Sequence, residues 1–341
     1  MLKEITYQCP SNIALVKYWG KKSGGVQLPA NASISWTLSN LFAKTTVSQE
    51  MASSLEVDFY LDGQLKENFV PKIKQFLDRI IPLAPELNNR KYTIHSTNNF
   101  PHGAGIASSA AGFGALALCF AELEGKFVSS SEEFYARASE FARLGSGSAC
   151  RSVYALPAVW GHHNDIPGSS DIHAVPFPFE IHENLKNWMD AVLIIDDGEK
   201  SVSSTEGHDL LKNHPYAEAR FKQANTNLTR ISECFVSGDV DTFMKIVESE
   251  ALQLHAMMMS SEPYYLLVKP NTLAAIEKVW AFRRQTNTPV CFTLDAGANV
   301  HVLFPKSSEI QVKNFIETEL LPYCKNQLYL CSDTGGLPIK S

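Results

Sequence analysis

The 341-residue sequence lacks paired cysteines and an excess of positive charge. Its seven cysteines are scattered, and they form neither a Cys-x-x-Cys pair nor a Cys/His spacing typical of a metal site. This pattern predicts reduced thiols and a cytoplasmic protein. The net charge of −6 argues against nucleic acid as a partner, because binding a phosphate backbone requires a basic surface.

A long apolar run is also missing. The N-terminus has no apolar core of the kind found in a signal peptide, and the longest uncharged stretch, residues 92–121, contains Asn98, Asn99, Pro101, His102 and four glycines. A membrane helix is predominantly apolar over about 20 residues, so no membrane partner is expected. The apolar share of 45% and the charged share of 19% are typical of a globular protein, and the length permits two domains.

Acidic residues are absent from three stretches of the chain, residues 5–49, 87–121 and 141–164. These stretches carry eight lysines and arginines, whereas the remaining residues sum to −14. Chance clustering together with buried strands would explain this distribution. The alternative is that the three stretches converge on an anionic ligand.

Hydrophobic periodicity predicts an α+β fold. Strands are expected at 12–19, 33–38, 55–61, 92–96, 191–196, 290–295, 300–304 and 327–331. Helices are expected at 70–81, 106–124, 131–144, 215–236, 239–258, 270–286 and 308–321. The change from a strand-rich to a helix-rich pattern places a domain boundary near residue 185, which divides the chain into domains 1–185 and 186–341.

The first motif is the glycine- and alanine-rich segment PHGAGIASSAAG at residues 101–112. Small residues let the backbone approach a ligand, and the unpaired N–H groups at the start of a helix attract phosphate. The hydroxyls of Ser108 and Ser109 suit phosphate or Mg²⁺. The segment is neither a Walker A loop nor a dinucleotide-binding fingerprint. A closely packed helix without a ligand is the alternative.

The second motif, KYWGKK at residues 17–22, brings three lysines together. On a strand, Lys17, Trp19 and Lys21 are expected to share one face. Such a cluster suits a multiply charged anion, and a solvated strand end is the alternative.

Two further motifs each supply one chemically active side chain. GSGSACRS at residues 145–152 is a turn that presents Arg151, whose planar guanidinium matches a carboxylate or phosphate. The alternative is a surface arginine between two helices. DAGAN at residues 295–299 ends an apolar strand with Asp295, a candidate general base. The alternative there is an Asx turn.

Taken in order, these segments resemble the GHMP kinase superfamily and, within it, the diphosphomevalonate decarboxylase family. The family motifs N-I-A-x-x-K-Y-W-G-K, L-P-x-N-x-S-x-S-x-T-L, N-N-F-P-x-x-x-G-L-A-S-S-A-A-G-F, G-S-G-S-A-C-R-S, V-S-S-T-x-G and D-A-G-P-N match residues 12–21, 28–38, 98–113, 145–152, 202–207 and 295–299. Ala298 replaces the proline, Ile106 replaces leucine, and His208 stands where methionine is frequent. A family arginine in the helix before the phosphate loop has no clear match except Lys72 or Lys74.

The resemblance implies a two-part fold, with a left-handed β-α-β unit in the N-terminal half and a ferredoxin-like C-terminal half. It implies phosphorylation of the 3-hydroxyl of (R)-5-diphosphomevalonate by ATP with Mg²⁺. Loss of phosphate and CO₂ then gives isopentenyl diphosphate. Asp295 is expected to accept the hydroxyl proton, Lys17 to keep Asp295 ionised and neutralise the phosphoryl group, and Arg151 to hold the substrate carboxylate. A homodimer is expected as well.

The resemblance also assigns binding roles. Substrate binding is expected at Tyr18, Trp19, Gly20, Lys21, Ser146, Gly147, Ser148, Ser204 and Thr205. ATP binding is expected at Asn98, Gly103, Ala104, Gly105, Ile106, Ala107, Ser108 and Ser109, with Ser108 or Ser109 near Mg²⁺. Independently of the resemblance, the helical pattern around His255 predicts that it packs in the core or in a lid, and Cys150 is the thiol expected to react if it is exposed.

Four other activities share parts of these motifs. They are decarboxylation of 5-phosphomevalonate, a mevalonate 3-kinase that stops at phosphorylation, another small-molecule kinase of the superfamily, and an inactive binding module. The Lys17, Arg151 and Asp295 set argues against a kinase that stops at phosphorylation, and intact Asp295 and Lys17 argue against an inactive module. Another kinase of the superfamily would not need the KYWGK and SGSACR segments together. The lysines of residues 17–22 fit a diphosphate better than a monophosphate by their charge.

Overall fold

A computed structural model describes residues 3–341 except 102–105, 156, 197 and 199–203; of residues 3 and 204–206 it describes the backbone only. The larger of its two sheets contains the long antiparallel pair β1 (Lys3–Val16) and β2 (Ser33–Met51). Its order is β12-β1-β2-β5-β3-β4, with β5 at Arg90–Asn98, β3 at Glu56–Leu61, β4 at Gln64–Leu65 and β12 at Ile339–Lys340. A branch of β6 (Ala158–Trp160) and β7 (Val175–Pro176) pairs with β2.

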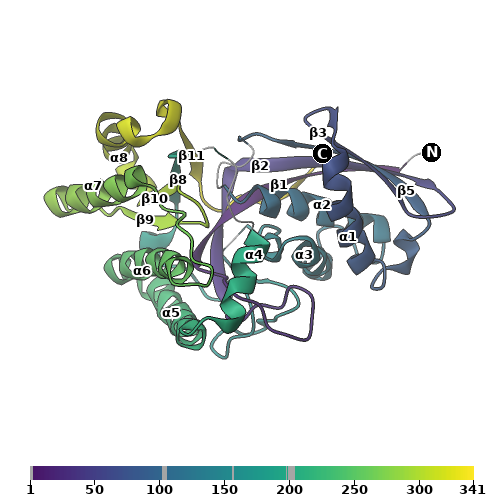
Figure 1. The fold of residues 1–341 in the computed structure, drawn as a ribbon, viewed down its shortest axis with the longest axis horizontal. Coiled ribbons are helices and arrows are strands. Elements are labelled where there is room, and N and C mark those ends of the chain that lie inside the picture. The colour runs from purple at the N-terminus through teal and green to yellow at the C-terminus, as the bar shows by residue number, and fades with distance from the viewer. Residues whose placement is uncertain (1–2, 102–105, 156, 197, 199–203) are drawn as a thin grey trace.

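Three helices accompany this sheet on the side of the molecule away from the second sheet (Figure 1). They are α1 (Val70–Ile80), α2 (Ser108–Glu124) and α3 (Glu132–Gly145). Helix α2 is buried along most of its length because its small residues allow close packing on β1 and β2. A Cβ atom at Gly114 would lie 2.5 Å from Cys9 Sγ, so the contact between α2 and β1 requires glycine there.

The second sheet is antiparallel in the order β11-β8-β10-β9. Its strands are β8 (Trp188–Leu193), β9 (Cys291–Leu294), β10 (Val300–Pro305) and β11 (Tyr329–Asp333). Apolar residues of α7 (Pro270–Thr286) and α8 (Glu309–Phe315) pack on one of its faces. Those of α5 (Ala217–Ser237) and α6 (Val240–Met259) pack on the other (Figure 1).

One apolar cluster joins the two sheets. Trp36 of β2 lies 5.8 Å from Trp188 of β8 and 5.3 Å from Phe243 of α6, measured between ring centroids. Fully buried aromatic rings in such contacts contribute about 0.5–1.5 kcal/mol per pair beyond their area. The two sheets therefore share a core, and the elements of each half are held in fixed positions relative to the other.

The remaining elements are short. Helix α4 spans Ser204–Asp209, and the five residues after Phe315, Ile316–Leu320, form a π-turn. Single 3₁₀ turns occur at Glu67–Phe69, Pro85–Leu87, Gly147–Arg151, Glu183–Leu185, Leu210–Asn213, Lys306–Ser308, Leu321–Tyr323 and Lys325–Gln327.

The α+β prediction is confirmed, and the expected helices at 70–81, 131–144, 215–236, 239–258 and 270–286 each match within two residues at either end. The helix expected at 106–124 also matches within two residues, at Ser108–Glu124. Other boundaries were wrong. The strand expected at 12–19 starts at Lys3 and ends at Val16, the one expected at 33–38 continues to Met51, and the one expected at 191–196 lies at Trp188–Leu193. The helix expected at 308–321 becomes a π-turn after Phe315.

Candidate active site

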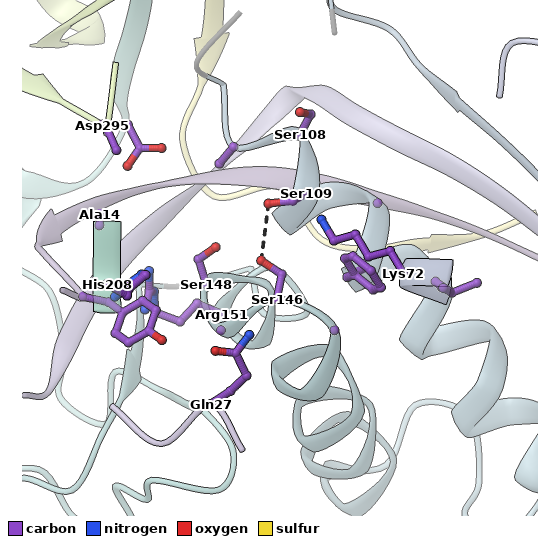
Figure 2. Close-up of a pocket in the computed structure, with 18 of the residues that line it drawn as sticks. Ala14, Gln27, Lys72, Ser108, Ser109, Ser146, Ser148, Arg151, His208 and Asp295 are labelled. Carbon is purple, nitrogen blue, oxygen red and sulfur yellow. Dashed lines mark hydrogen bonds between the residues drawn. The ribbon is translucent and has the colours of Figure 1, made fainter. Parts of the chain in front are cut away.

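A pocket lies where the end of β1, the start of α2, the 3₁₀ turn Gly147–Arg151 and the turn after β9 meet. Each of the four predicted motifs contributes side chains to it. Figure 2 shows Asp295 on one side of the pocket and Lys72 on the other, with Ser109, Ser146 and Ser148 between them. The structure therefore brings together segments as far apart in the chain as Ala14 and Ala296.

Lys17 is the first residue after β1, and only 1% of its surface is exposed. Its backbone N–H donates to Glu250 Oε2 at 2.9 Å, and its Nζ donates to the carbonyl oxygen of Ala14 at 2.7 Å. Burial lowers the pKa of the ammonium group to about 8, although the negative charges of Asp295 and Glu250 act in the opposite direction. Lys17 is thus a fixed cation whose pKa lies nearer to neutral pH than that of a free lysine.

Asp295 follows the last residue of β9 and lines the pocket. Its backbone carbonyl accepts a hydrogen bond from Gly297 N at 2.7 Å and contacts His255 Nε2 at 3.1 Å. The charge of its side chain influences the pKa of Lys17, of Arg151 and of His208. Asp295 is therefore the carboxylate around which these basic groups gather.

Arg151 is buried, with 1% of its surface exposed, so the alternative of a surface arginine is wrong. Its Nε donates to Ser35 Oγ at 2.9 Å, and its Nη1 donates to Ser33 Oγ at 2.7 Å. Burial lowers the pKa of the guanidinium. These serine hydroxyls orient the arginine but carry no charge, which leaves its positive charge available to an anionic ligand in the pocket.

The segment after Lys17 does not continue the strand, so the prediction that Lys17, Trp19 and Lys21 share a strand face is wrong. The chain leaves the sheet instead, and the rings of Tyr18 and Trp19 lie 4.2 and 4.4 Å from the ring of His208 between centroids. Gly20 N donates to His208 Nδ1 at 2.9 Å. Lys17, Tyr18, Trp19 and Lys21 nevertheless all line the pocket.

The start of α2 meets the 3₁₀ turn at the centre of the pocket. Ser109 Oγ lies 3.3 Å from Ser146 Oγ (Figure 2). Ala107 precedes the helix with a left-handed φ of 40°, and its methyl side chain cannot cap the helix. The first N–H groups of α2 and the hydroxyls of Ser108 and Ser109 therefore form a donor set of the type that binds phosphate.

The two halves of the chain match two family models that belong together. Residues 9–172 match the diphosphomevalonate decarboxylase-like N-terminal domain, and residues 191–334 match the mevalonate 5-diphosphate decarboxylase C-terminal domain. A diphosphomevalonate decarboxylase of Ganoderma lucidum is 30% identical over 93% of this chain and 83% of its own length. This chain belongs to the diphosphomevalonate decarboxylase family.

Other members of the decarboxylase family agree with this assignment. The human diphosphomevalonate decarboxylase is 30% identical over 87% of this chain and 76% of its own. The mevalonate diphosphate decarboxylase of Staphylococcus aureus has a TM-score of 0.86 at 27% identity, covering 100% of this chain and 98% of that one. A neighbour solved with MVAPP, AMPPCP and magnesium has a TM-score of 0.85 at 29% identity, covering 100% and 99% of the two chains.

Most of the residues expected from the decarboxylase family resemblance lie at the pocket. Among those described, Asn98, Ala107, Ser108, Ser109, Ser146, Gly147 and Ser148 line it. Ile106 is buried in the core that joins the two sheets instead. Gly103, Ala104 and Gly105 lie outside the described residues, and so do the side chains of Ser204 and Thr205, whose backbone begins α4.

The end of the pocket near α1 differs in character. Phe59, Leu61, Phe69, Ile73, Phe113 and Leu116 line it. The ammonium group of Lys72 lies 5.2 Å from the ring centroid of Phe113, and Lys74 is not among the lining residues. Of the two lysines that the sequence left open as replacements for the family arginine, Lys72 is the one at the pocket.

The described part of the chain contains no group of three His, Cys, Asp or Glu residues arranged to hold a metal ion. It also contains no helix with the length and apolarity needed to cross a bilayer. Cys150 is fully buried, and burial raises the pKa of its thiol to about 12, so the expectation that it reacts if exposed does not apply.

Sequence reasoning missed three buried residues near the motifs. His208 was noted only as a departure from the family pattern, yet it lines the pocket. Burial lowers its pKa to about 3, so the ring is neutral and its Nδ1 can accept the Gly20 N–H. Glu250 carried no signal, and His255 was expected to serve as packing. The presence of histidine where the family frequently has methionine was the sequence signal that could have singled out His208.

Proposed function

We propose that this chain catalyses the ATP-dependent decarboxylation of (R)-5-diphosphomevalonate to isopentenyl diphosphate, ADP, phosphate and CO₂. Transfer of the γ-phosphoryl group of ATP to the 3-hydroxyl converts hydroxide, a poor leaving group, into phosphate. When phosphate leaves, the electrons of the breaking C–CO₂ bond form the double bond. The observation that carries this proposal is the convergence of buried Lys17 and buried Arg151 on Asp295 in one pocket.

Asp295 accepts the proton of the 3-hydroxyl as the oxygen attacks phosphorus. It suits this role because its backbone is held by the turn after β9 while its side chain borders the pocket. Lys17 lies within electrostatic range of that carboxylate and neutralises negative charge on the transferring phosphoryl group. The buried surroundings strengthen both interactions, because little water screens them.

Arg151 holds the substrate carboxylate. Its guanidinium is oriented by Ser33 and Ser35, and bidentate binding of a carboxylate needs a planar fork of this kind. The carboxylate becomes neutral CO₂ during the reaction, so the interaction weakens as the product forms. Arg151 therefore positions the group that leaves without trapping the product.

The other residues that the family resemblance implicates bind the two substrates. We assign the diphosphate and the mevalonate chain to Tyr18, Trp19, Gly20, Lys21, Ser146, Gly147, Ser148, Ser204 and Thr205. We assign the ATP phosphates to the segment from Asn98 to Ser109, including Gly103, Ala104 and Gly105. The start of α2 supports this assignment, because its N–H groups and positive dipole end favour negative charge.

Mg²⁺ fits the hydroxyls of Ser108 and Ser109 as oxygen ligands, because hard cations prefer oxygen. Asp295 is the one carboxylate among the described lining residues, so the ATP phosphates would supply most of the negative ligands. When bound, the ion would neutralise charge on the ATP phosphates.

Three further expectations remain proposals. A boundary between domains 1–185 and 186–341 is supported by the gap between the two family-model matches at residues 172 and 191. A cytoplasmic location is supported by the seven cysteines, none of which forms a disulfide. A homodimer is supported by the family resemblance alone.

One assay tests the activity against its alternatives. Purified protein receives MgATP with mevalonate, its 5-phosphate or its 5-diphosphate, and both ADP and CO₂ are measured. We expect equal amounts of ADP and CO₂ from the 5-diphosphate. ADP without CO₂ would identify a kinase, products from the 5-phosphate alone would identify the monophosphate decarboxylase, and no product from any substrate would indicate a binding module.

A further inference from the structure

Helix α6 supplies Leu254 to the pocket lining and contacts both β1 and β9, the strands that end just before Lys17 and Asp295. These two strands belong to different sheets, so no shared ladder sets the distance between their ends. Two buried polar side chains of α6 contact those ends. Glu250 is 0% exposed and His255 is 2% exposed.

The carboxylate of Glu250 makes four hydrogen bonds. Its Oε2 accepts from Lys17 N at 2.9 Å and from Arg220 Nη2 at 2.6 Å. Its Oε1 accepts from Arg220 Nη1 at 3.1 Å and from Asn227 Nδ2 at 2.6 Å. Because α5 supplies Arg220 and Asn227, the carboxylate is fixed from one side and holds the Lys17 backbone from the other.

His255 acts on the second strand end. Its Nε2 lies 3.1 Å from the carbonyl oxygen of Asp295, which can only accept, so the proton of the ring is on Nε2. Burial lowers the pKa of His255 to about 4, so the ring stays neutral in neutral solution. The two side chains are five residues apart, a rise of about 7.5 Å along a helix.

We infer that Glu250 and His255 are positioning residues, through which α6 sets the separation and orientation of Lys17 and Asp295. The inference rests on the proposed function, in which these two residues act on one phosphoryl transfer. Misplacing reacting groups by about 1 Å can cost about 10²-fold in rate. A rigid helix that contacts both residues prevents such a displacement.

Glu250 has a second effect through its charge. The charged groups that influence Lys17 are Asp295 from the turn after β9, Glu250 from α6, Arg151 from the 3₁₀ turn and Asp190 from β8. Glu250 is one of the anions that favour the protonated lysine. Replacing Glu250 by neutral glutamine therefore lowers the pKa of Lys17 further, and the positive charge left on Arg220 acts in the same direction.

The chain offers matched controls for both residues. Glu248 lies on the same helix, is 6% exposed and is paired with Arg283 at 2.7 Å, but it does not contact either strand end at the pocket. His163 is 9% exposed, and its Nε2 contacts a backbone carbonyl, that of Asn225, at 3.0 Å. A merely structural role of a buried glutamate or histidine would show equally in these controls.

The experiment compares E250Q with E248Q and H255L with H163L in the full chain, because leucine removes the ring N–H donor that a glutamine amide would replace. For each protein, kcat and both KM values are measured with MgATP and diphosphomevalonate, together with the pH profile of kcat/KM and the thermal unfolding midpoint. We expect E250Q and H255L to lower kcat by about 10- to 100-fold with KM values within about threefold. We expect the alkaline limb of the profile to move to lower pH in E250Q only.

Equal losses of kcat in E250Q and E248Q, or in H255L and H163L, would overturn the inference, as would an unchanged alkaline limb in E250Q. If E250Q is unfolded at the assay temperature, the pair H255L and H163L decides alone. Lack of turnover by the wild-type chain would instead refute the proposed function, so the two failures are distinguishable.

Discussion

The two ends of the pocket differ in chemical character. Lys17, Arg151 and His208 at one end are each no more than 6% exposed and are oriented by hydrogen bonds to fixed backbone or hydroxyl groups. The end near α1 is lined by apolar side chains and by Lys72, an exposed lysine. The charges of Lys17 and Arg151, held rigidly and shielded from water, are suited to stabilising a transition state, whereas an apolar surface contributes mainly to binding. The comparison implies that substitutions at the charged end lower kcat and those at the apolar end raise KM.

The largest effect is expected from Asp295→Ala. Loss of the proton acceptor should lower kcat by about 10²- to 10⁴-fold, the range that general acid–base catalysis contributes. Affinity for diphosphomevalonate should stay within about tenfold, because the carboxylate acts mainly in the transition state. Single-turnover kinetics and calorimetric binding measure the two quantities. A large loss of binding with turnover retained would contradict this role.

Arg151→Lys should be the next most severe change, with kcat about 10²-fold lower. A lysine keeps the charge, but it cannot present the planar fork that Ser33 and Ser35 orient. Stopped-flow measurement should show that ADP formation and CO₂ formation are lost together. If instead ADP accumulates ahead of CO₂, Arg151 acts in the decarboxylation step alone.

The third prediction concerns pH. The active form of Lys17 is the cation, so activity should fall as pH rises through its pKa, which burial lowers to about 8. This alkaline fall in activity should appear in the pH profile of kcat/KM, which reports the free enzyme. In the profile of kcat it should lie at higher pH, because bound ATP adds negative charge beside Lys17 and raises the pKa of the lysine.

Lys17→Arg supplies the test of that assignment. Arginine stays protonated in this range, so the alkaline limb should disappear even though kcat is lower. A limb that persists unchanged in the variant would show that another group titrates.

Local sequence patterns predicted where the helices lie, because a hydrophobic stripe with a period of 3.6 residues depends only on neighbours in the sequence. The end of β1 was not predictable in the same way. Tyr18 and Trp19 have high strand propensity, yet the strand stops at Val16. The causes are tertiary: the Lys17 N–H binds Glu250, and the rings of Tyr18 and Trp19 pack against His208.

The residues of the site divide in the same way, into those marked by local sequence and those set by tertiary contacts. Lys17, Arg151 and Asp295 stood out in the sequence because each sits in a motif of unusual composition. Glu250 and His255 lie in an ordinary helical pattern, and their relation to Lys17 and Asp295 exists only when α6 packs against both sheets. The residues to which we assign the chemistry stand out in the sequence, whereas those to which we assign their positioning become visible only in the fold.

The smallest effect is expected at the apolar end. Lys72→Met removes a cation that lies over Phe113, near the start of α2 where we place the ATP phosphates. An exposed charge pair is worth about 0.2–1 kcal/mol, so loss of the Lys72 charge near the phosphates should raise the KM for ATP by no more than about fivefold while kcat is unchanged. Lys74→Met, on the same helix and outside the pocket, is the matched control and should leave both constants unchanged.

If the KM for diphosphomevalonate rises instead of that for ATP, Lys72 takes the place of the family arginine at the substrate diphosphate. A tenfold or greater loss of kcat would show that the apolar end takes part in the chemistry, and would contradict the assignment of catalysis to the charged end and binding to the apolar end.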